Sequence, residues 1–178
     1  MSPELECGIW DKERICLVPV SFLKALPVYH RETIPSDYLD VMGHMNIRWY
    51  MALYDKAIGN FFVSHGLSAD FIHENQIGTF ALKHVINYYA EVRVGQNVAI
   101  HTRLLAISDR RFHAMHFMIN ETTGQLASTI ELMGTFADLK KRRATSMPSA
   151  IAANFEAKLK SDQNLEWEAP VSGVIRLD

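Results

Sequence analysis

The sequence predicts an α+β fold in which an antiparallel β-sheet wraps around one long central helix. Between about residues 46 and 65, apolar side chains recur at three-or-four spacing, which is typical of a helix. From about residue 78 to residue 139 the period changes to two, and turn signals divide this stretch into strands. Tight turns join antiparallel neighbours, so we expect a single antiparallel sheet.

The composition is that of one globular domain with a sizeable core. The chain has 178 residues, of which 48% are hydrophobic and 21% are charged, and its net charge is −2. That charge argues against a dedicated nucleic-acid-binding protein. The two cysteines, Cys7 and Cys16, form neither a disulfide framework nor a zinc motif and favour a cytoplasmic location. Residues 15–28 are apolar but are interrupted by prolines and a lysine, so we expect neither secretion nor a membrane span.

The first half of the chain predicts an arm, a strand and the long helix. Residues 1–27 read as an irregular arm with one short helical turn. The β-like segment that follows ends at Pro35. The helix is expected over about Asn46 to His65, where Gly66 supplies a stop signal. Residues 70–75 predict another turn.

The second half predicts four strands and a C-terminal helix. We expect the strands over residues 78–92, 96–108, 110–120 and 125–139, joined by tight turns. A helix starting at a proline is expected over residues 147–162. The organisation is therefore an arm (1–27), a main domain (28–145), and a C-terminal helix with its tail (146–178). A sheet curled around a central helix is the hotdog architecture.

The segment Asp40–Tyr50, D-V-M-G-H-M-N-I-R-W-Y, resembles the motif D-x-x-G-H-x-N-x-x-x-Y of acyl-CoA thioesterases in the 4-hydroxybenzoyl-CoA thioesterase family. Residues 86–117 look like that family's second signature, and the resemblance covers about Val28 to Leu139. Within that family, the chain is especially similar to short thioesterases associated with carnitine breakdown. The resemblance implies acyl-CoA hydrolysis without a cofactor by a dimer or tetramer, with active sites at the interface. The family usually has an acid two residues after the tyrosine, where this chain has Ala52.

Four residues of this motif are candidates for the catalytic site. Thioester hydrolysis needs a group that stabilises charge on the carbonyl oxygen and a group that delivers a nucleophile. The N–H groups near Gly43 and His44, beside a helix N-terminus, are the predicted oxyanion hole. Asp40 is expected either to attack the carbonyl or to act as general base for a water. Asn46 or His44 is expected to keep Asp40 ionised.

Each acid also has a simpler interpretation. An aspartate before a helix is most often a cap, and Asp37 reads as a turn residue. Asp55 lies inside an otherwise apolar helix, where some hotdog thioesterases place their acid, although a solvent-facing position is the alternative. His113 and His116 point to opposite faces of one strand, so we expect no metal site.

Coenzyme A carries phosphates, so cationic residues are expected at the mouth of the site. Arg110 and Arg111 follow one turn, and Lys140–Arg143 follow the last strand. A solvated run of charge is the alternative for either cluster.

Aromatic residues on the central helix, Trp49, Tyr50 and Tyr54, are expected to pack in the core. If they face the site instead, they could cage a quaternary ammonium group, which would suit a betainyl thioester. Lys83 and Asn87, on the strand expected at the dimer contact, are predicted to line the partner's site.

Two other functions fit the same residues. One is a hotdog enoyl-CoA hydratase or dehydratase, which also uses an Asp and a His. Those enzymes tend to carry a proline between the two residues, and Met42-Gly43 offers none. The other is a non-catalytic acyl-CoA-binding module.

Overall fold

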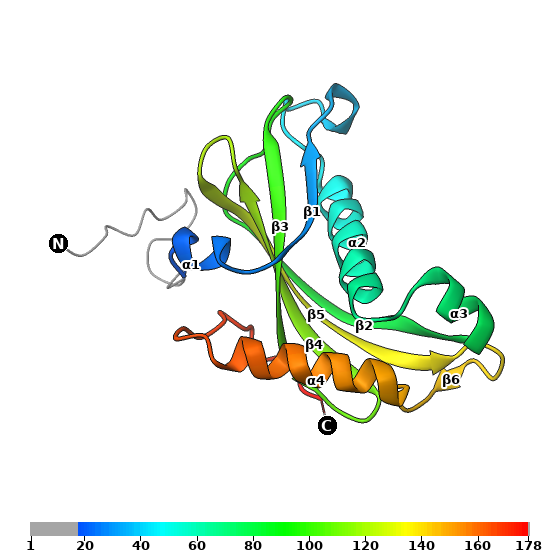
Figure 1. Cartoon of the computed structure of the whole chain (residues 1–178). Helices are drawn as coiled ribbons and strands as arrows, with labels where there is room; N and C mark the ends of the chain where they lie inside the picture. Colours follow the sequence, from blue (N-terminus) through cyan, green and yellow to red (C-terminus); the bar gives the residue numbers. More distant parts are fainter. Residues whose placement is uncertain (1–17, 178) are drawn as a thin grey trace.

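The computed structural model describes residues 18–177 and confirms the predicted α+β hotdog fold (Figure 1). A curved sheet has the strand order β1-β3-β4-β5-β2, and a short strand, β6, pairs with β5. All pairs are antiparallel, as expected. The strands are β1 (Val28–Thr33), β2 (Ile77–Tyr88), β3 (Asn97–Ile107), β4 (Arg111–Asn120), β5 (Gln125–Asp138) and β6 (Arg143–Ala144).

The long helix lies on the concave side of the curled sheet (Figure 1). The helices are α1 (Val20–Lys24), the 3-10 turn η1 (Ser36–Tyr38), α2 (Ile47–Ser64), α3 (Ala69–Asn75) and α4 (Ser149–Gln163). None of these described helices combines the length and apolarity needed to cross a bilayer.

Local signals set both ends of α2. The Asn46 side chain accepts a hydrogen bond from the Arg48 N–H, which caps the N-terminus. Gly66, at φ +97°, follows the helix and confirms the predicted stop. A buried stripe at four-residue spacing, Leu53–Ala57–Phe61, packs against the sheet. The opposite face, which includes Asp55, Lys56 and Asn60, is exposed, so a single chain covers only one side of α2.

The predicted hairpin between β2 and β3 is wrong, because these strands are not neighbours. β2 pairs along its length with β5, while β3 lies between β1 and β4. After β2 ends, the Tyr89 N–H still donates to the Ala127 carbonyl, at 2.8 Å. Gly95 does make a turn, but its N–H donates to the Ile34 carbonyl at 2.8 Å. The chain therefore turns at Gly95 as predicted, but after this turn β3 pairs with β1 and not with β2.

The side of the sheet next to β3 is closed by two different elements. β1 pairs only with the first half of β3, and the Asn60 side chain of α2 donates to the Tyr29 carbonyl, at 2.6 Å, where β1 bulges. Where β1 no longer pairs with β3, helix α4 packs beside β3 instead: the Leu104 N–H donates to the Asp162 carboxylate at 2.7 Å. Phe155 of α4 also packs in the main core, so the C-terminal helix is part of the same packed unit.

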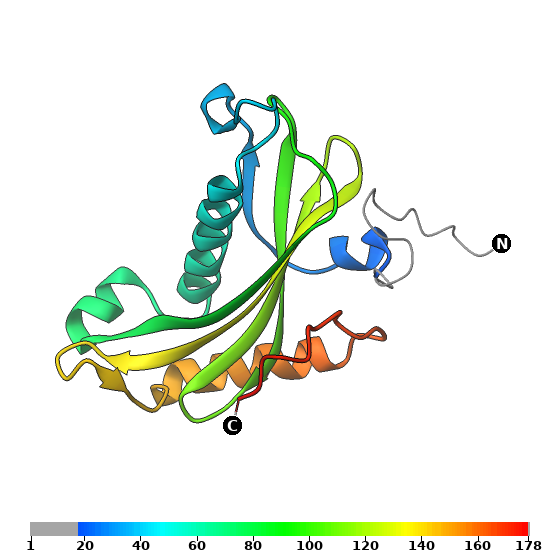
Figure 2. The same ribbon diagram turned by 180° about the vertical axis from the view of Figure 1, so that it is seen from behind.

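The outer face of the sheet is covered by α1 and the C-terminal tail (Figure 2). Leu23 of α1 is fully buried in a second cluster that contains Phe117 of β4, and Trp167 of the tail packs edge-on against Phe117. The short helical turn expected in the arm is therefore confirmed as α1. Cys7 and Cys16 lie outside the described residues.

Candidate active site

The predicted catalytic motif forms a tight turn directly before α2. Gly43 adopts φ +82°, which a residue with a side chain rarely takes, and its N–H donates to the Asp40 carbonyl at 3.1 Å. Asp40 Oδ1 accepts a hydrogen bond from the Met42 N–H at 2.8 Å. His44 Nδ1 lies 3.6 Å from Asp40 Oδ2. The structure thus brings Asp40 and His44 together, and one carboxylate oxygen is already held by the turn.

The backbone donors available for an oxyanion differ in part from the expected ones. The Gly43 N–H is used inside the turn, whereas the N–H groups of His44 and Ile47 have no hydrogen-bond partner among residues 18–177. Ile47 is the first residue of α2, where the helix dipole favours an anion. Asn46 caps α2 instead of bonding to Asp40, because its side chain accepts the Arg48 N–H. Sequence reasoning missed Ile47, although the position after a capping asparagine was a usable signal.

Trp49 and Tyr50 pack at the start of α2 and do not line the cavity described below. The Trp49 ring stacks on Tyr38, with centroids 3.7 Å apart, and the Arg48 guanidinium lies 5.2 Å from its centroid. Tyr50 is buried edge-to-face against Tyr88, and this burial raises the pKa of Tyr50 to about 12. The core-packing interpretation therefore describes both residues in the single chain.

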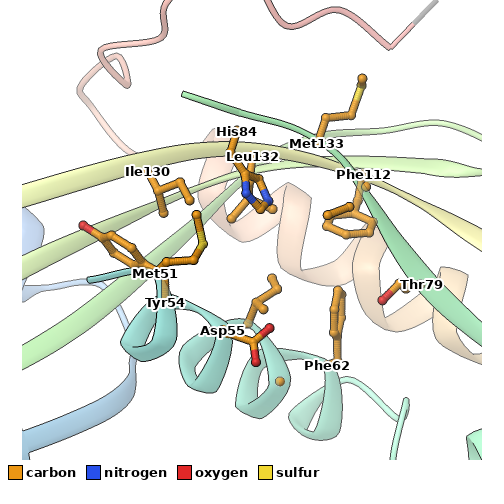
Figure 3. A pocket seen from close by; sticks show the side chains of 14 residues that line it. Met51, Tyr54, Asp55, Phe62, Thr79, His84, Phe112, Ile130, Leu132 and Met133 are labelled. Atoms are coloured by element: carbon orange, nitrogen blue, oxygen red, sulfur yellow. The ribbon is translucent and has the colours of Figure 1, made fainter. Parts of the chain in front are cut away.

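A cavity of about 290 Å³ opens between α2 and strands β2, β4 and β5 (Figure 3). Its walls are mainly apolar and aromatic, as in many small-molecule sites. Asp55 reaches it from α2, and His84 faces it from β2. Asp40 and the rest of the predicted catalytic motif do not line it in the single chain.

Asp55 and His84 give this cavity its electrostatic character. Asp55 forms no hydrogen bond or ion pair with another side chain in the described part of the chain. Burial lowers the pKa of His84, and the nearby Asp55 carboxylate opposes that shift only in part. The shift favours the uncharged imidazole, so His84 is a weak counter-ion for the Asp55 carboxylate. Sequence reasoning raised Asp55 as a candidate and gave His84 no role in the site.

Two glycines line the cavity and shape it in different ways. Gly59 lies one turn after Asp55 on α2, and an added β-carbon there would meet nothing within 4 Å. Gly134 of β5 is packed in the opposite way, since its β-carbon would lie 2.3 Å from Phe112 Cζ. A glycine inside a helix lowers helix stability, so the open space at Gly59 is consistent with a site that needs room.

The two predicted cationic clusters meet at one end of the sheet. Arg110 pairs with Asp109 at 3.2 Å, and Asp109 also accepts a hydrogen bond from Ser146, which follows β6. This end lies far from Asp40 in one chain, because Phe62, near the end of α2, is about 22 Å along the helix from Ile47. The motif around Asp40 and the cations therefore do not form one site within a single chain.

The second cluster, Lys140–Arg143, is exposed, and part of it lies on a regular element. Arg143 belongs to β6, a strand that the sequence did not predict, and lies opposite Asp138 of β5. The Arg142 guanidinium lies 4.9 Å from the centroid of the Phe80 ring. Arg111 begins β4 at the same end of the sheet.

Lys83 and Asn87 lie on β2, which is an edge strand of the sheet. Lys83 Nζ donates to the Val174 carbonyl of the C-terminal tail at 2.9 Å, and the Asn87 carbonyl accepts a hydrogen bond from Ser128. Residues 81–84 of this strand are exposed. Within residues 18–177, no three His, Cys, Asp or Glu side chains are grouped so that they could hold a metal ion.

Comparison with known proteins identifies the family. Residues 34–155 match the Thioesterase-like superfamily. The chain is 29% identical over 122 residues to the L-carnitine dehydrogenase/betainyl-CoA thioesterase of Agrobacterium fabrum, covering 68% of this chain and 25% of that protein. It therefore spans about a quarter of that relative. It is also 24% identical over 154 residues to the betainyl-CoA thioesterase of Pseudomonas aeruginosa, covering 86% of this chain and 96% of that protein.

Solved structures agree on the fold. A Staphylococcus aureus protein in complex with CoA superposes with a TM-score of 0.77 at 22% identity, covering 86% of this chain and 97% of the other. A 1,4-dihydroxy-2-naphthoyl-CoA thioesterase from Synechocystis gives 0.65 at 14% identity, covering 72% and 96%. The names of the two curated relatives support the expected thioester hydrolase. The chain belongs to the Thioesterase-like superfamily, which confirms the resemblance drawn from its motif.

Proposed function

We propose that this protein hydrolyses a small acyl-CoA thioester to the free acid and CoA, and that betainyl-CoA is a substrate. The observation that carries the proposal is the Asp40 carboxylate in the turn before α2, 3.6 Å from His44 Nδ1, together with the His44 and Ile47 N–H groups, which have no partner among residues 18–177. This geometry lies inside the matched family segment. The name of the Pseudomonas relative, which aligns over 96% of its length, supports the acyl group.

In this proposal the backbone stabilises charge and Asp40 supplies the nucleophile. The thioester oxygen accepts hydrogen bonds from the His44 and Ile47 N–H groups, which stabilise the negative charge that develops on it. Because Asp40 Oδ1 is held by the turn, Oδ2 is the oxygen that reacts. It either removes a proton from an attacking water or attacks the carbonyl carbon to form an anhydride that water then opens. In both routes the C–S bond breaks and CoA leaves as the thiol after protonation.

We further propose a dimer or tetramer in which the active site lies between subunits. Val41, Met42 and Ile47 are strongly exposed around the catalytic turn, although they are apolar. Exposed apolar side chains beside a polar site are typical of an interaction surface. β2 is an edge strand, and pairing with the β2 strand of a second copy would extend the sheet.

Such a pairing would give both the β2 residues and the arginines a role in substrate binding. Lys83 and Asn87 of one chain would lie near the catalytic turn of the other. Arg110 and Arg111, which are remote from Asp40 in their own chain, would lie near the CoA phosphates bound across the interface. The cytoplasmic location expected from the cysteine content remains a proposal.

Thiol release from a panel of acyl-CoAs tests the function. Short, long, aromatic and betainyl thioesters should be compared, and we expect Asp40→Asn and Asp40→Ala to lower kcat at least ~100-fold. Asp37→Asn, three residues earlier, is the matched control and should retain activity. Near-wild-type turnover by both Asp40 variants would remove Asp40 from the mechanism. Hydration of an enoyl-CoA without thiol release would favour a hydratase, and binding without any turnover would favour a binding module.

A further inference from the structure

We propose that Asp55 is a specificity residue that selects an acyl group bearing a fixed positive charge. The cation would lie in the cavity, beside the Asp55 carboxylate and against the aromatic rings of Tyr54, Phe62 and Phe112. This inference rests on the proposed thioesterase function and names the residues that recognise the acyl group.

The charge of the cavity is the first argument. Asp55 is the one formally charged residue among those that line it. The cation nearest along the helix, Lys56, is paired with Glu32 at 2.9 Å, and partial burial lowers the pKa of His84, which favours its uncharged form. The cavity therefore presents one unneutralised carboxylate, which favours a cationic ligand and disfavours an anionic one.

The chemistry of the walls is the second argument. Phe62 and Phe112 meet edge-to-face, with centroids 5.2 Å apart, and the Tyr54 ring lines the same cavity. A primary ammonium group would need several hydrogen-bond acceptors in this site, and apolar walls cannot provide them. A quaternary ammonium group needs none, because it is attracted by aromatic faces and by a nearby carboxylate.

The position of Asp55 on α2 is the third argument. Asp55 lies eight residues after Ile47, which corresponds to about 12 Å along the helix. A hydrogen bond of about 3 Å, a short acyl chain and an ion contact of about 4 Å together fill that distance. Asp55 is thus too far from the reacting carbonyl to act as its base. Gly59, one turn further along, leaves the space that a bulky head group requires.

Two substrates of the same shape and different charge test the inference. Betainyl-CoA carries a trimethylammonium group, and 3,3-dimethylbutyryl-CoA replaces its nitrogen by carbon. We expect Asp55→Asn to lower kcat/KM for the cationic substrate at least ~10-fold and to change the neutral one less than ~3-fold. A second pair with two more methylene groups, 4-trimethylammoniobutyryl-CoA and its carbon analogue, tests whether the preference holds at the longer end of the available span.

Matched variants separate this role from others. Glu156→Gln removes a carboxylate from α4, outside the cavity, and should change neither substrate. Phe62→Leu should lower kcat/KM for the cationic substrate more than for the neutral one. Equal losses on both substrates with Asp55→Asn, or no loss on either, would overturn the inference.

The same assay distinguishes this inference from the proposed function. If wild-type protein releases CoA from the neutral substrate and shows no preference for the cationic one at either length, the specificity role fails and the thioesterase function stands. If it releases CoA from no thioester tested, both proposals fall.

Discussion

The Phe112 ring occupies the space that a side chain at position 134 would take. A β-carbon added to Gly134 would lie 2.3 Å from Phe112 Cζ and 2.7 Å from Cε1. In this position the Phe112 ring also meets Phe62 edge-to-face, with centroids 5.2 Å apart. The size and aromatic character of the cavity therefore depend on the absence of one methyl group.

Replacing Gly134 with alanine should disturb both stability and function. We expect a loss of about 1–3 kcal/mol in the free energy of unfolding, because the Phe112 ring must leave its position. Urea denaturation measures the loss, and the KM for the preferred acyl-CoA should rise. Gly78→Ala is the control, since its β-carbon would approach only the flexible Leu139 side chain, at 3.4 Å. Equal stability of the two variants would contradict this account of Gly134.

Gly59→Ala should have the opposite effect on stability. Nothing lies within 4 Å of an added β-carbon, so the helix gains about 0.5–1 kcal/mol from lost backbone freedom in the unfolded chain. The methyl group enters the cavity beside Asp55, so activity on the trimethylammonium substrate should fall. Thermal unfolding and steady-state kinetics test the two effects. A less stable variant, or one with unchanged kinetics, would show that Gly59 does not serve the cavity.

Asp162 should be essential for the attachment of α4. It is buried, binds the Leu104 N–H at 2.7 Å and pairs with Lys158. Asp162→Ala leaves a poorly solvated ammonium group without its partner, so we expect a loss of about 3–5 kcal/mol. The double variant Lys158→Met/Asp162→Asn should recover most of that loss, because it removes both charges and keeps an acceptor for Leu104. Chemical denaturation of the three proteins provides the comparison, and failure of the double variant to recover stability would argue against an electrostatic cause.

His116 should make stability fall in mild acid. It is fully buried beside Tyr54 and bonded to Thr102, and burial lowers the pKa of His116 to about 3. Between its ordinary value of 6.5 and that pKa, the unfolded chain binds a proton that the folded chain does not. The free energy of unfolding therefore decreases as the pH falls through this window, by up to about 1.4 kcal/mol per pH unit.

The variant His116→Gln should show a shallower decline between pH 6.5 and 4.5. It keeps a polar group for Thr102 and cannot take up the proton. His73→Gln, at an exposed position on α3, is the control and should follow wild type. Identical slopes for wild type and His116→Gln would show that other groups govern the acid response.

The parts of the fold that the sequence predicted are those encoded locally. Asn46 and Gly66 mark the ends of α2 with their own conformations, and the turn from Asp40 to His44 is held by bonds within five residues. The β2–β3 connection could not be assigned in this way. Gly95 makes the same local turn whether the next strand returns to β2 or pairs with β1, and only the closure of the whole sheet decides between them.

The site shows the same division. Asp40 and His44 are neighbours in sequence, so their meeting was predictable. Asp55 and His84 come from α2 and β2, and both reach one cavity only because the sheet curls around the helix. The aromatic rings of α2 show the same limit: Trp49 stacks on Tyr38, whereas Tyr54, five residues later, lines the cavity. Helical periodicity alone could not separate these two orientations.

The two sides of the sheet end very differently, and this difference bears on aggregation. On one side β1 is short and bulged, its Tyr29 carbonyl is occupied by Asn60, and α4 takes over beyond it. On the other side β2 offers twelve residues. Two copies joined through β2 would present only the short, occupied sides to further copies, so growth would stop at a closed pair instead of continuing into a fibril.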